Sequence, residues 1–109
     1  MVDQSVLKSI NNYFLNLKQS NIPVSFGVLF GSYVKENADE NSDIDLVIIS
    51  PYFDRPGSKL QGILKLWKIA ARTDTRIEPI HCGEVEWKEK KGRMIIEIAR
   101  QEGEILIPE

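Results

Sequence analysis

The segments Leu29-Phe30-Gly31-Ser32 and, ten residues later, Asp43-Ile44-Asp45-Leu46 decide the fold. Apolar runs rich in β-favouring residues cover residues 24–30 and 44–50, and turn-forming residues bound both, so they predict two strands. Side chains alternate between the two faces of a strand, so Asp43 and Asp45 share one face. The sequence therefore predicts two neighbouring carboxylates where the second strand begins.

Two carboxylates this close together indicate a site for a bound cation. Like charges repel and raise a carboxyl pKa unless a positive ion keeps both groups ionised. Mg²⁺ prefers oxygen ligands and is shared between one or two carboxylates and substrate phosphates. The chain contains one histidine, His81, and one cysteine, Cys82, which are too few for a zinc site of nitrogen and sulfur ligands. Asp43 and Asp45 therefore predict Mg²⁺, and with it a nucleotide.

Gly31 and Ser32 supply the phosphate-binding half of such a site. A residue without a side chain lets the backbone approach a phosphate, and a hydroxyl beside free N–H groups donates to it. A helical turn is predicted over residues 33–36, and a turn beginning at Ser32 would add its positive dipole end. No Walker-type loop of glycines and lysine occurs in the chain, which excludes a P-loop protein.

A third acid is expected on a neighbouring strand, because in-line phosphoryl chemistry commonly uses two metal ions. Residues 77–80 are the remaining strand-like segment with an acid, Glu78, at its centre. Pro79 cannot donate to a ladder and so predicts an edge strand. Glu78 is therefore predicted to be a metal ligand and the general base toward an incoming hydroxyl. His81 is expected on the opposite face from Glu78.

Three helices are predicted around these strands. Helical spacing of apolar residues marks residues 4–19, with Asp3 as the N-cap, and a last helix from Met94 to a stop at Gly103. The second helix begins at Ser58, whose spacing to Gln61 matches a capping box. Residues 104–107 predict a final short strand. This order of elements predicts one domain, residues 1–109, with an α/β (α+β) fold: a small mixed β-sheet with flanking helices.

The second helix carries one apolar stripe that is predicted to pack on the sheet, formed by Leu60, Ile63, Leu64, Trp67 and Ala71. Trp67 is accordingly predicted to lie in the core, whereas Trp87 lies among charged residues and is predicted to be exposed. The basic residues of this helix are interpreted as a solvated face: Lys65, Lys68 and Arg72.

Composition limits the partners. The chain has 109 residues, with 14 basic and 16 acidic side chains, a net charge of -2 and a pI near 5.5. This balance offers no global field for phosphate backbones or anionic membranes, so neither nucleic acid nor a membrane is expected as a partner. One cysteine cannot form an internal disulfide, and no secretory leader or membrane-spanning run is recognised, so a cytoplasmic location is expected.

The Gly31-Ser32 and Asp43-Ile44-Asp45 segments resemble the signature of the DNA polymerase beta-like nucleotidyltransferase superfamily. Chain length, element order and the Glu-Gly-Glu-Ile-Leu ending at residues 102–106 are similar to its minimal nucleotidyltransferases. The resemblance implies a mixed sheet that bears the acids, and transfer of a nucleoside monophosphate from a nucleoside triphosphate to a hydroxyl. Gly31 and Ser32 would hold the triphosphate, Asp43 and Asp45 would bind magnesium, and Glu78 would be the third acid.

The chain departs from that family at one point. Many members follow the Gly-Ser with an arginine-rich turn, whereas here Lys35 is the only basic residue near the phosphates. Lys35 is therefore included, with Gly31 and Ser32, among the predicted nucleotide-binding residues.

Several minimal members are antitoxins, and each is encoded beside a small helical toxin that has an RNase site. These antitoxins silence the toxin by adenylylating a tyrosine. The resemblance therefore implies transfer of AMP from ATP to a hydroxyl of a toxin encoded by an adjacent gene. Two alternatives stay open. The chain could neutralise its partner by occlusion with little catalysis, or it could modify a small molecule such as an antibiotic, which requires a homo-oligomer to build an acceptor pocket.

Overall fold

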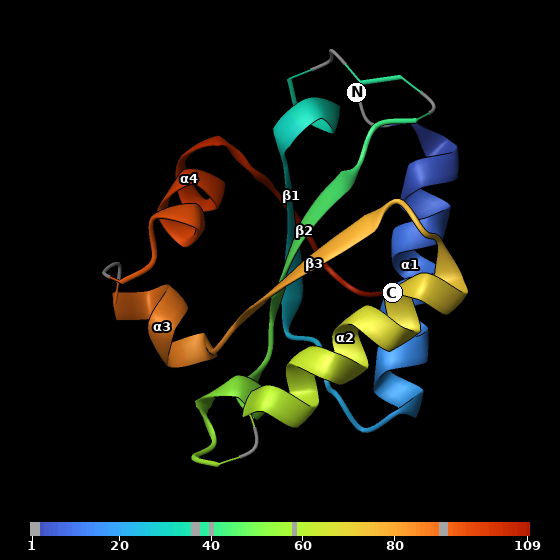
Figure 1. The fold of residues 1–109 in the computed structure, drawn as a ribbon. Coiled ribbons are helices and arrows are strands. Elements are labelled where there is room, and N and C mark those ends of the chain that lie inside the picture. Colours follow the sequence, from blue (N-terminus) through green and yellow to red (C-terminus); the bar gives the residue numbers. More distant parts are fainter. Residues whose placement is uncertain (1–2, 36–37, 40, 58, 90–91) are drawn as a thin grey trace.

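A four-stranded mixed sheet forms the centre of the protein, in a computed structural model that describes residues 3–35, 38–39, 41–57, 59–89 and 92–109 (Figure 1). The strand order is β3-β2-β1-β4. Strand β1 pairs antiparallel with both β2 and β4, and β2 pairs parallel with β3. The bounds of the strands are Phe26–Phe30 for β1, Ile44–Ile49 for β2, Ile77–Cys82 for β3 and Glu104–Leu106 for β4.

Helices cover both faces of this sheet. Helices α1 (Gln4–Gln19) and α2 (Lys59–Thr73) lie on one face, and α3 (Glu84–Glu89) and α4 (Met94–Glu102) lie on the other (Figure 1). The predicted mixed sheet with flanking helices is confirmed, as is the edge position of the strand that contains Pro79. The first helix begins after the predicted cap, because the Asp3 carboxylate accepts a hydrogen bond from the Ser5 N–H at 2.7 Å.

The alternation of side chains along β2 divides the core into two halves. Ile44, Leu46 and Ile48 are fully buried against the side chains of α1 and α2. Val47 and Ile49 are fully buried on the opposite face, with the apolar side chains of α4. Since residues of one face follow each other at every second position, Asp45 belongs to the α4 face. A strand buried on both faces thus carries one carboxylate, at the second of its six positions.

The prediction placed the buried stripe of α2 at the wrong position around the helix. The residues that α2 buries are Gly62, Leu66, Ile69 and Ala70. Of the predicted stripe, Ile63 is partly buried and packs against the same core. Leu60, Leu64 and Trp67 are instead 70%, 61% and 49% exposed, and Ala71 is exposed as well. Both sets have helical spacing, so periodicity alone could not choose between them. Gly62 decides the choice, because any side chain there would collide with the rings of Tyr52 and Phe53.

Trp87 is also placed differently from the prediction. Its ring is partly buried, packs edge-on against Phe26 with the ring centroids 5.5 Å apart, and lies under the Arg100 guanidinium at 4.8 Å. It belongs to α3, a helix that the charged stretch after Gly83 did not predict. The Asp54 carboxylate caps this helix by accepting hydrogen bonds from the N–H groups of Glu84 and Val85 at 2.9 and 3.2 Å.

Smaller differences concern the ends of elements. The first strand begins at Phe26, two residues after the predicted start, and the third continues through Cys82. A 3₁₀ helix, Pro51–Asp54, follows β2 directly. Ser58, of the predicted capping box, and Glu36, of the predicted turn, lie outside the described residues. No helix in the described ranges is long and apolar enough to cross a membrane.

Helices α1 and α2 are joined by a buried hydrogen bond, from the Tyr13 hydroxyl to the Leu66 carbonyl oxygen at 2.9 Å. Burial raises the pKa of Tyr13 well above its usual value, so the hydroxyl stays a donor. We expect Tyr13→Phe to lower the free energy of unfolding by about 1 kcal/mol, the usual contribution of one such bond. Urea unfolding measures the change.

Tyr52→Phe is the control for this variant, because its hydroxyl makes no hydrogen bond to the residues that the structure describes. Equal stability of the two variants would show that the Tyr13 hydroxyl does not hold the helices together.

Candidate active site

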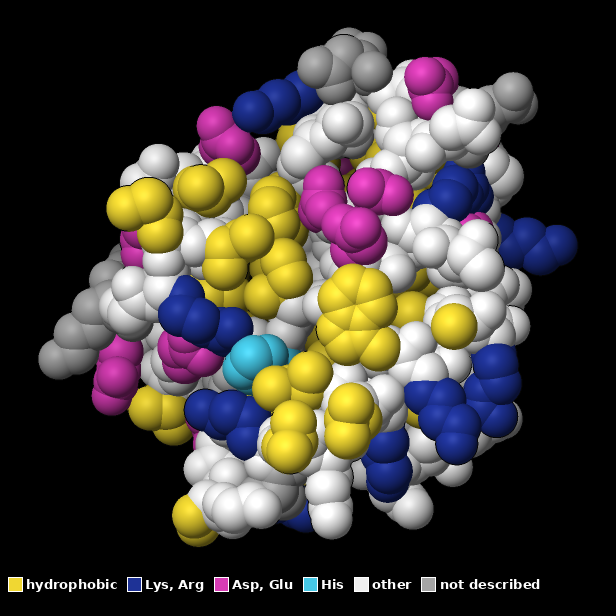
Figure 2. Space-filling model, viewed as in Figure 1, with side chains coloured by type: hydrophobic (Ala, Val, Ile, Leu, Met, Phe, Trp, Pro, Cys, Tyr) yellow, Lys and Arg dark blue, Asp and Glu magenta, His cyan; other side chains and the backbone are white. Residues whose placement is uncertain are grey.

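The three predicted acids meet at one end of the sheet. In the parallel pair of β2 and β3, Asp45 lies directly beside Glu78, and Asp45 also lies opposite Phe30, the last residue of β1. Asp43 precedes β2 by one residue and is exposed. Figure 2 shows acidic side chains gathered near the upper ends of β2 and β3, in the middle of the face in view. Strand register therefore brings together side chains that are far apart in the sequence.

The acids influence each other's ionisation. Burial raises the pKa of Asp45, as does the charge of Asp43, while a hydrogen bond from Glu78 works in the opposite direction. Burial also raises the pKa of Glu78, and the charges of Asp43 and Asp45 raise it further. The negative charges of the three acids therefore oppose one another's ionisation. A cation bound at this point would relieve that repulsion.

Gly31 lies against these acids for a steric reason. Its φ of +79° is in the left-handed region that favours glycine, and a Cβ built on it would collide with the Asp45 carboxylate oxygen. The residue opens the 3₁₀ helix Gly31–Tyr33, and its carbonyl accepts hydrogen bonds from the N–H groups of Val34 and Lys35, both at 3.1 Å. Ser32 is the next residue of this turn. The predicted phosphate-binding turn therefore packs directly on one of the predicted metal ligands.

Lys35 forms an ion pair with Glu102, at the end of α4, with 3.7 Å between Nζ and Oε2. The lysine side chain is 56% exposed. An exposed pair of this kind contributes only about 0–1 kcal/mol. Lys35 is therefore able to exchange Glu102 for a phosphate at little energetic cost.

A hydrogen-bond network that the sequence did not predict fixes the segments around the acids. The Tyr33 hydroxyl lies 3.1 Å from the Asp39 carbonyl oxygen and 3.4 Å from that of Ser42, and it accepts a bond from Arg76 at 3.2 Å. Arg76 in turn accepts, through its carbonyl, a bond from the Ile44 N–H at 2.8 Å. The network links the glycine turn, the loop before Asp43 and the start of β3. Its partners are separated by up to 43 residues, and no local pattern marks such contacts.

The guanidinium of Arg76 is held by Asp74. Two hydrogen bonds, of 3.1 and 2.8 Å, join the two side chains, and the Ser9 hydroxyl donates to Asp74 from α1. Hydrogen bonds from Arg76 hold the pKa of Asp74 well below its usual value. Both side chains are largely buried. Through Ser9, this pair anchors the network to α1.

The donors at this end of the sheet suit a hard cation. They are all carboxylate oxygens, the ligands that Mg²⁺ prefers. Among the described residues, no group of three or more His, Cys, Asp or Glu side chains is already arranged to hold a metal ion. Mg²⁺ takes one or two carboxylates and completes its shell with water and substrate phosphates, so it does not require a complete protein cage.

His81 does not join the acids. Its ring packs near Phe53, with 5.5 Å between ring centroids, beside a hollow of about 610 Å³ that Lys59 and Arg93 also line. Burial, with the charges of Arg93 and Lys59, lowers the pKa of His81 to about 4. The ring is therefore neutral at pH 7, on the opposite face of β3 from Glu78, as predicted.

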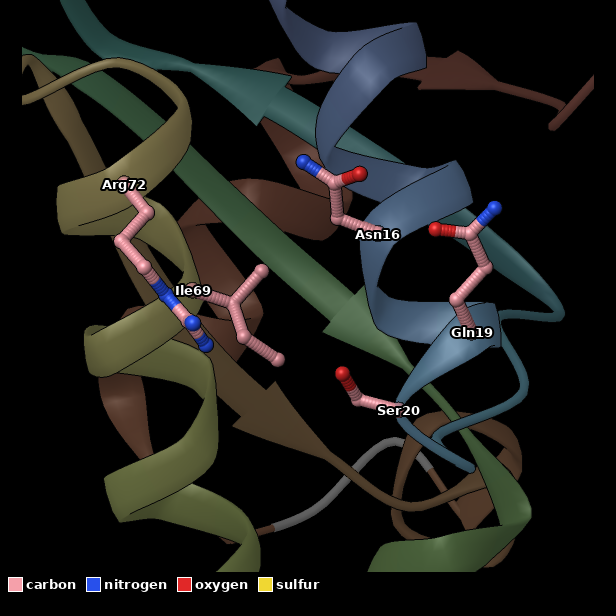
Figure 3. A pocket seen from close by; sticks show the side chains of 5 residues that line it. All are labelled: Asn16, Gln19, Ser20, Ile69 and Arg72. Atoms are coloured by element: carbon pink, nitrogen blue, oxygen red, sulfur yellow. The ribbon is translucent and has the colours of Figure 1, made fainter.

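Another hollow lies between α1 and α2. Figure 3 shows Asn16, Gln19 and Ser20 on one side of it and Ile69 and Arg72 on the other. Its volume is about 270 Å³. It lies on the face of the sheet that α1 and α2 cover, whereas Asp45 lies on the other face, so the hollow is not part of the candidate active site.

The Asp74–Arg76 pair predicts how stability depends on pH. Because the pKa of Asp74 is lowered on folding, its stabilisation is present above the unfolded pKa of about 3.9 and is lost as the pH falls below it. We expect Asp74→Asn to lower the free energy of unfolding at pH 7 by about 1–3 kcal/mol. Urea unfolding at pH 7 and pH 3 should show the difference from the parent chain shrinking at the lower pH.

Glu104→Gln, at an exposed position of β4, is the control and should leave both curves unchanged. A difference between Asp74→Asn and the parent chain that is the same at both pH values would contradict the assignment to this carboxylate.

Comparisons with known proteins identify the family and support the fold. The family described as "Nucleotidyltransferase domain" matches residues 10–105, which include every predicted site residue. A search of curated proteins returns no match. Among solved structures, the chain is similar to one described as "Crystal structure of the toxin-antitoxin with AMP-PNP", with a TM-score of 0.55 and 21% identity, over 91% of this chain and 73% of that chain. That likeness establishes the fold. Because the family match spans most of its length, the chain belongs to the nucleotidyltransferase domain family.

Proposed function

We propose that this chain is a magnesium-dependent protein adenylyltransferase that moves AMP from ATP to a hydroxyl of a partner protein, as the antitoxin of a toxin–antitoxin pair. The observation that carries the proposal is the placement of Asp45 beside Glu78, with Gly31 packed on the Asp45 carboxylate. Family membership supports nucleotidyl transfer. The similar structure was crystallised with AMP-PNP as a toxin–antitoxin, which supports both the nucleotide and the kind of partner.

Each part of the site has a role in this reaction. Gly31 and Ser32, with Lys35 beside them, bind the triphosphate through backbone N–H groups, a hydroxyl and a positive charge. Asp43, Asp45 and Glu78 would hold Mg²⁺, in a two-metal arrangement, which supplies the charge that neutralises the phosphates. Glu78 in its ionised form accepts the proton of the acceptor hydroxyl. The hydroxyl oxygen bonds to the α-phosphorus, the bond to the β-phosphate oxygen breaks, and pyrophosphate leaves.

The acceptor comes from outside the chain in this proposal. Asp43 is exposed and Asp45 and Glu78 are only partly buried, so the acids open onto the protein surface. A second protein that covers them supplies both the hydroxyl and a wall that excludes water. Since the cytoplasm supplies ATP, the proposal places the reaction there.

The proposal predicts labelling of the partner. With α-labelled ATP, Mg²⁺ and the product of the adjacent gene, we expect the parent chain to label that protein. Asp43→Ala/Asp45→Ala should reduce labelling by about 100-fold or more, because charge stabilisation by the metal is worth several kcal/mol. Autoradiography of the separated proteins measures it.

Glu89→Ala removes an exposed carboxylate of α3 and should leave labelling at the parent level. Equal labelling by Asp43→Ala/Asp45→Ala and the parent chain would disprove catalysis at this site.

A second candidate function is neutralisation of the partner by occlusion. The scarcity of basic residues after the glycine turn favours it, because Lys35 is the one basic residue that follows this turn closely in the sequence. Calorimetry separates the two functions. Tight binding of the partner without magnesium-dependent binding of ATP would favour occlusion, whereas binding of both supports transfer.

A further inference from the structure

Exposed apolar side chains form a stripe on α2 and a second group on α4. On α2, Leu60, Leu64 and Trp67 lie on one side of the helix, since their spacing of four and three residues is helical. Each is between 49% and 70% exposed. On α4 the exposed set is Met94, Ile95 and Ile98, at 77%, 41% and 41%. We refer to these six residues as the α2–α4 surface.

The α2–α4 surface borders the candidate active site. Figure 2 shows apolar side chains on two sides of the acidic group, over α2 below it and over α4 to its left. The edge strand β3, which carries Glu78, runs between the two helices in this view (Figure 1). Anything that reaches the acids from this side therefore lies on apolar side chains of both helices.

The charges around the α2–α4 surface indicate which kind of molecule binds there. Helix α2 contains four basic residues, Lys59, Lys65, Lys68 and Arg72, and no acidic one. Its apolar stripe thus has a basic border, in a chain whose net charge is -2. A matching partner has an apolar patch with carboxylates around it. A polyanion such as RNA would match the basic border but would leave the apolar stripe without a matching surface.

A second copy of the chain fits poorly. A two-fold contact through this surface sets the same patch against itself. The acids near the centre of this surface would then face the same acids of the second copy. Like charges opposed in this way disfavour the contact.

We propose that the α2–α4 surface is the docking surface for the acceptor protein, whose apolar patch, bordered by carboxylates, rests on both helices and presents the reacting hydroxyl to Asp43, Asp45 and Glu78. The inference rests on the proposed function, because it takes the acceptor to be a protein. Exposed apolar side chains that gather on one surface mark interaction sites more often than singly scattered ones. Aromatic residues such as Trp67 are frequent energetic centres of interfaces.

The test measures binding separately from transfer. The protein encoded by the adjacent gene is titrated, without nucleotide, into the parent chain and into Leu60→Ser/Leu64→Ser/Trp67→Ser. We expect this triple variant to bind about 100-fold more weakly, because it removes the aromatic centre and its apolar neighbours. All three residues are exposed, so the variant should fold, which circular dichroism checks. Leu15→Ser, an equally exposed leucine on α1, is the matched control and should bind like the parent chain.

A second pair of variants tests the charge argument. Lys68→Glu should weaken binding of the same protein, and the weakening should diminish at high salt, because it places a carboxylate at the border of the stripe. Lys18→Glu, on α1, should not change binding.

Three results would overturn the proposal. One is equal affinity of the triple variant and the parent chain. Another is a dimer of the isolated chain in sedimentation that the triple variant disperses, which would assign the surface to a second copy. The third is RNA binding that the triple variant abolishes. If the parent chain does not label the partner protein but the triple variant still binds that protein more weakly than the parent chain, the docking proposal stands and the proposed function fails. The two proposals can therefore fail separately.

Discussion

Negative charge crowded at the ends of β2 and β3 is the constraint on which the other features of the site depend. Parallel pairing places Asp45 beside Glu78, and burial together with the nearby charges raises the pKa of both. Hydrophobic packing on both faces of β2 stabilises a register that electrostatics alone would oppose. A site that is unfavourable without a cation and favourable with one is suited to binding a metal together with its phosphates.

Neighbouring segments are shaped by this crowding. Gly31 leaves room for the Asp45 carboxylate, and the Tyr33 hydroxyl joins the loop before Asp43 to the start of β3 through Arg76. The arrangement is pre-organised by hydrogen bonds to backbone and side chains whose own positions are fixed by packing. In the proposed function the chain would contribute a rigid half of an active site, and the α2–α4 surface would receive the other half from a second protein.

The local parts of this site could be predicted from sequence, whereas the long-range parts could not. Alternation along a strand placed Asp43 and Asp45 on one face, and the remaining strand identified Glu78, which the register puts beside Asp45. The buried side of α2 was predicted wrongly, because two apolar stripes share the helical period and a steric contact of Gly62 with distant rings selects one. Helix α3 was missed because its cap, Asp54, lies 30 residues away.

The central claim is that these acids and the Gly31 turn form one nucleotide and metal site. A crystal structure of the chain grown with Mg²⁺ and a non-hydrolysable ATP analogue tests it most directly. The account predicts metal density between Asp43 and Asp45, shared with a phosphate oxygen of the analogue, and the triphosphate on the N–H groups of Gly31 and Ser32. An analogue bound elsewhere on the chain, with no ion at these carboxylates, would contradict it.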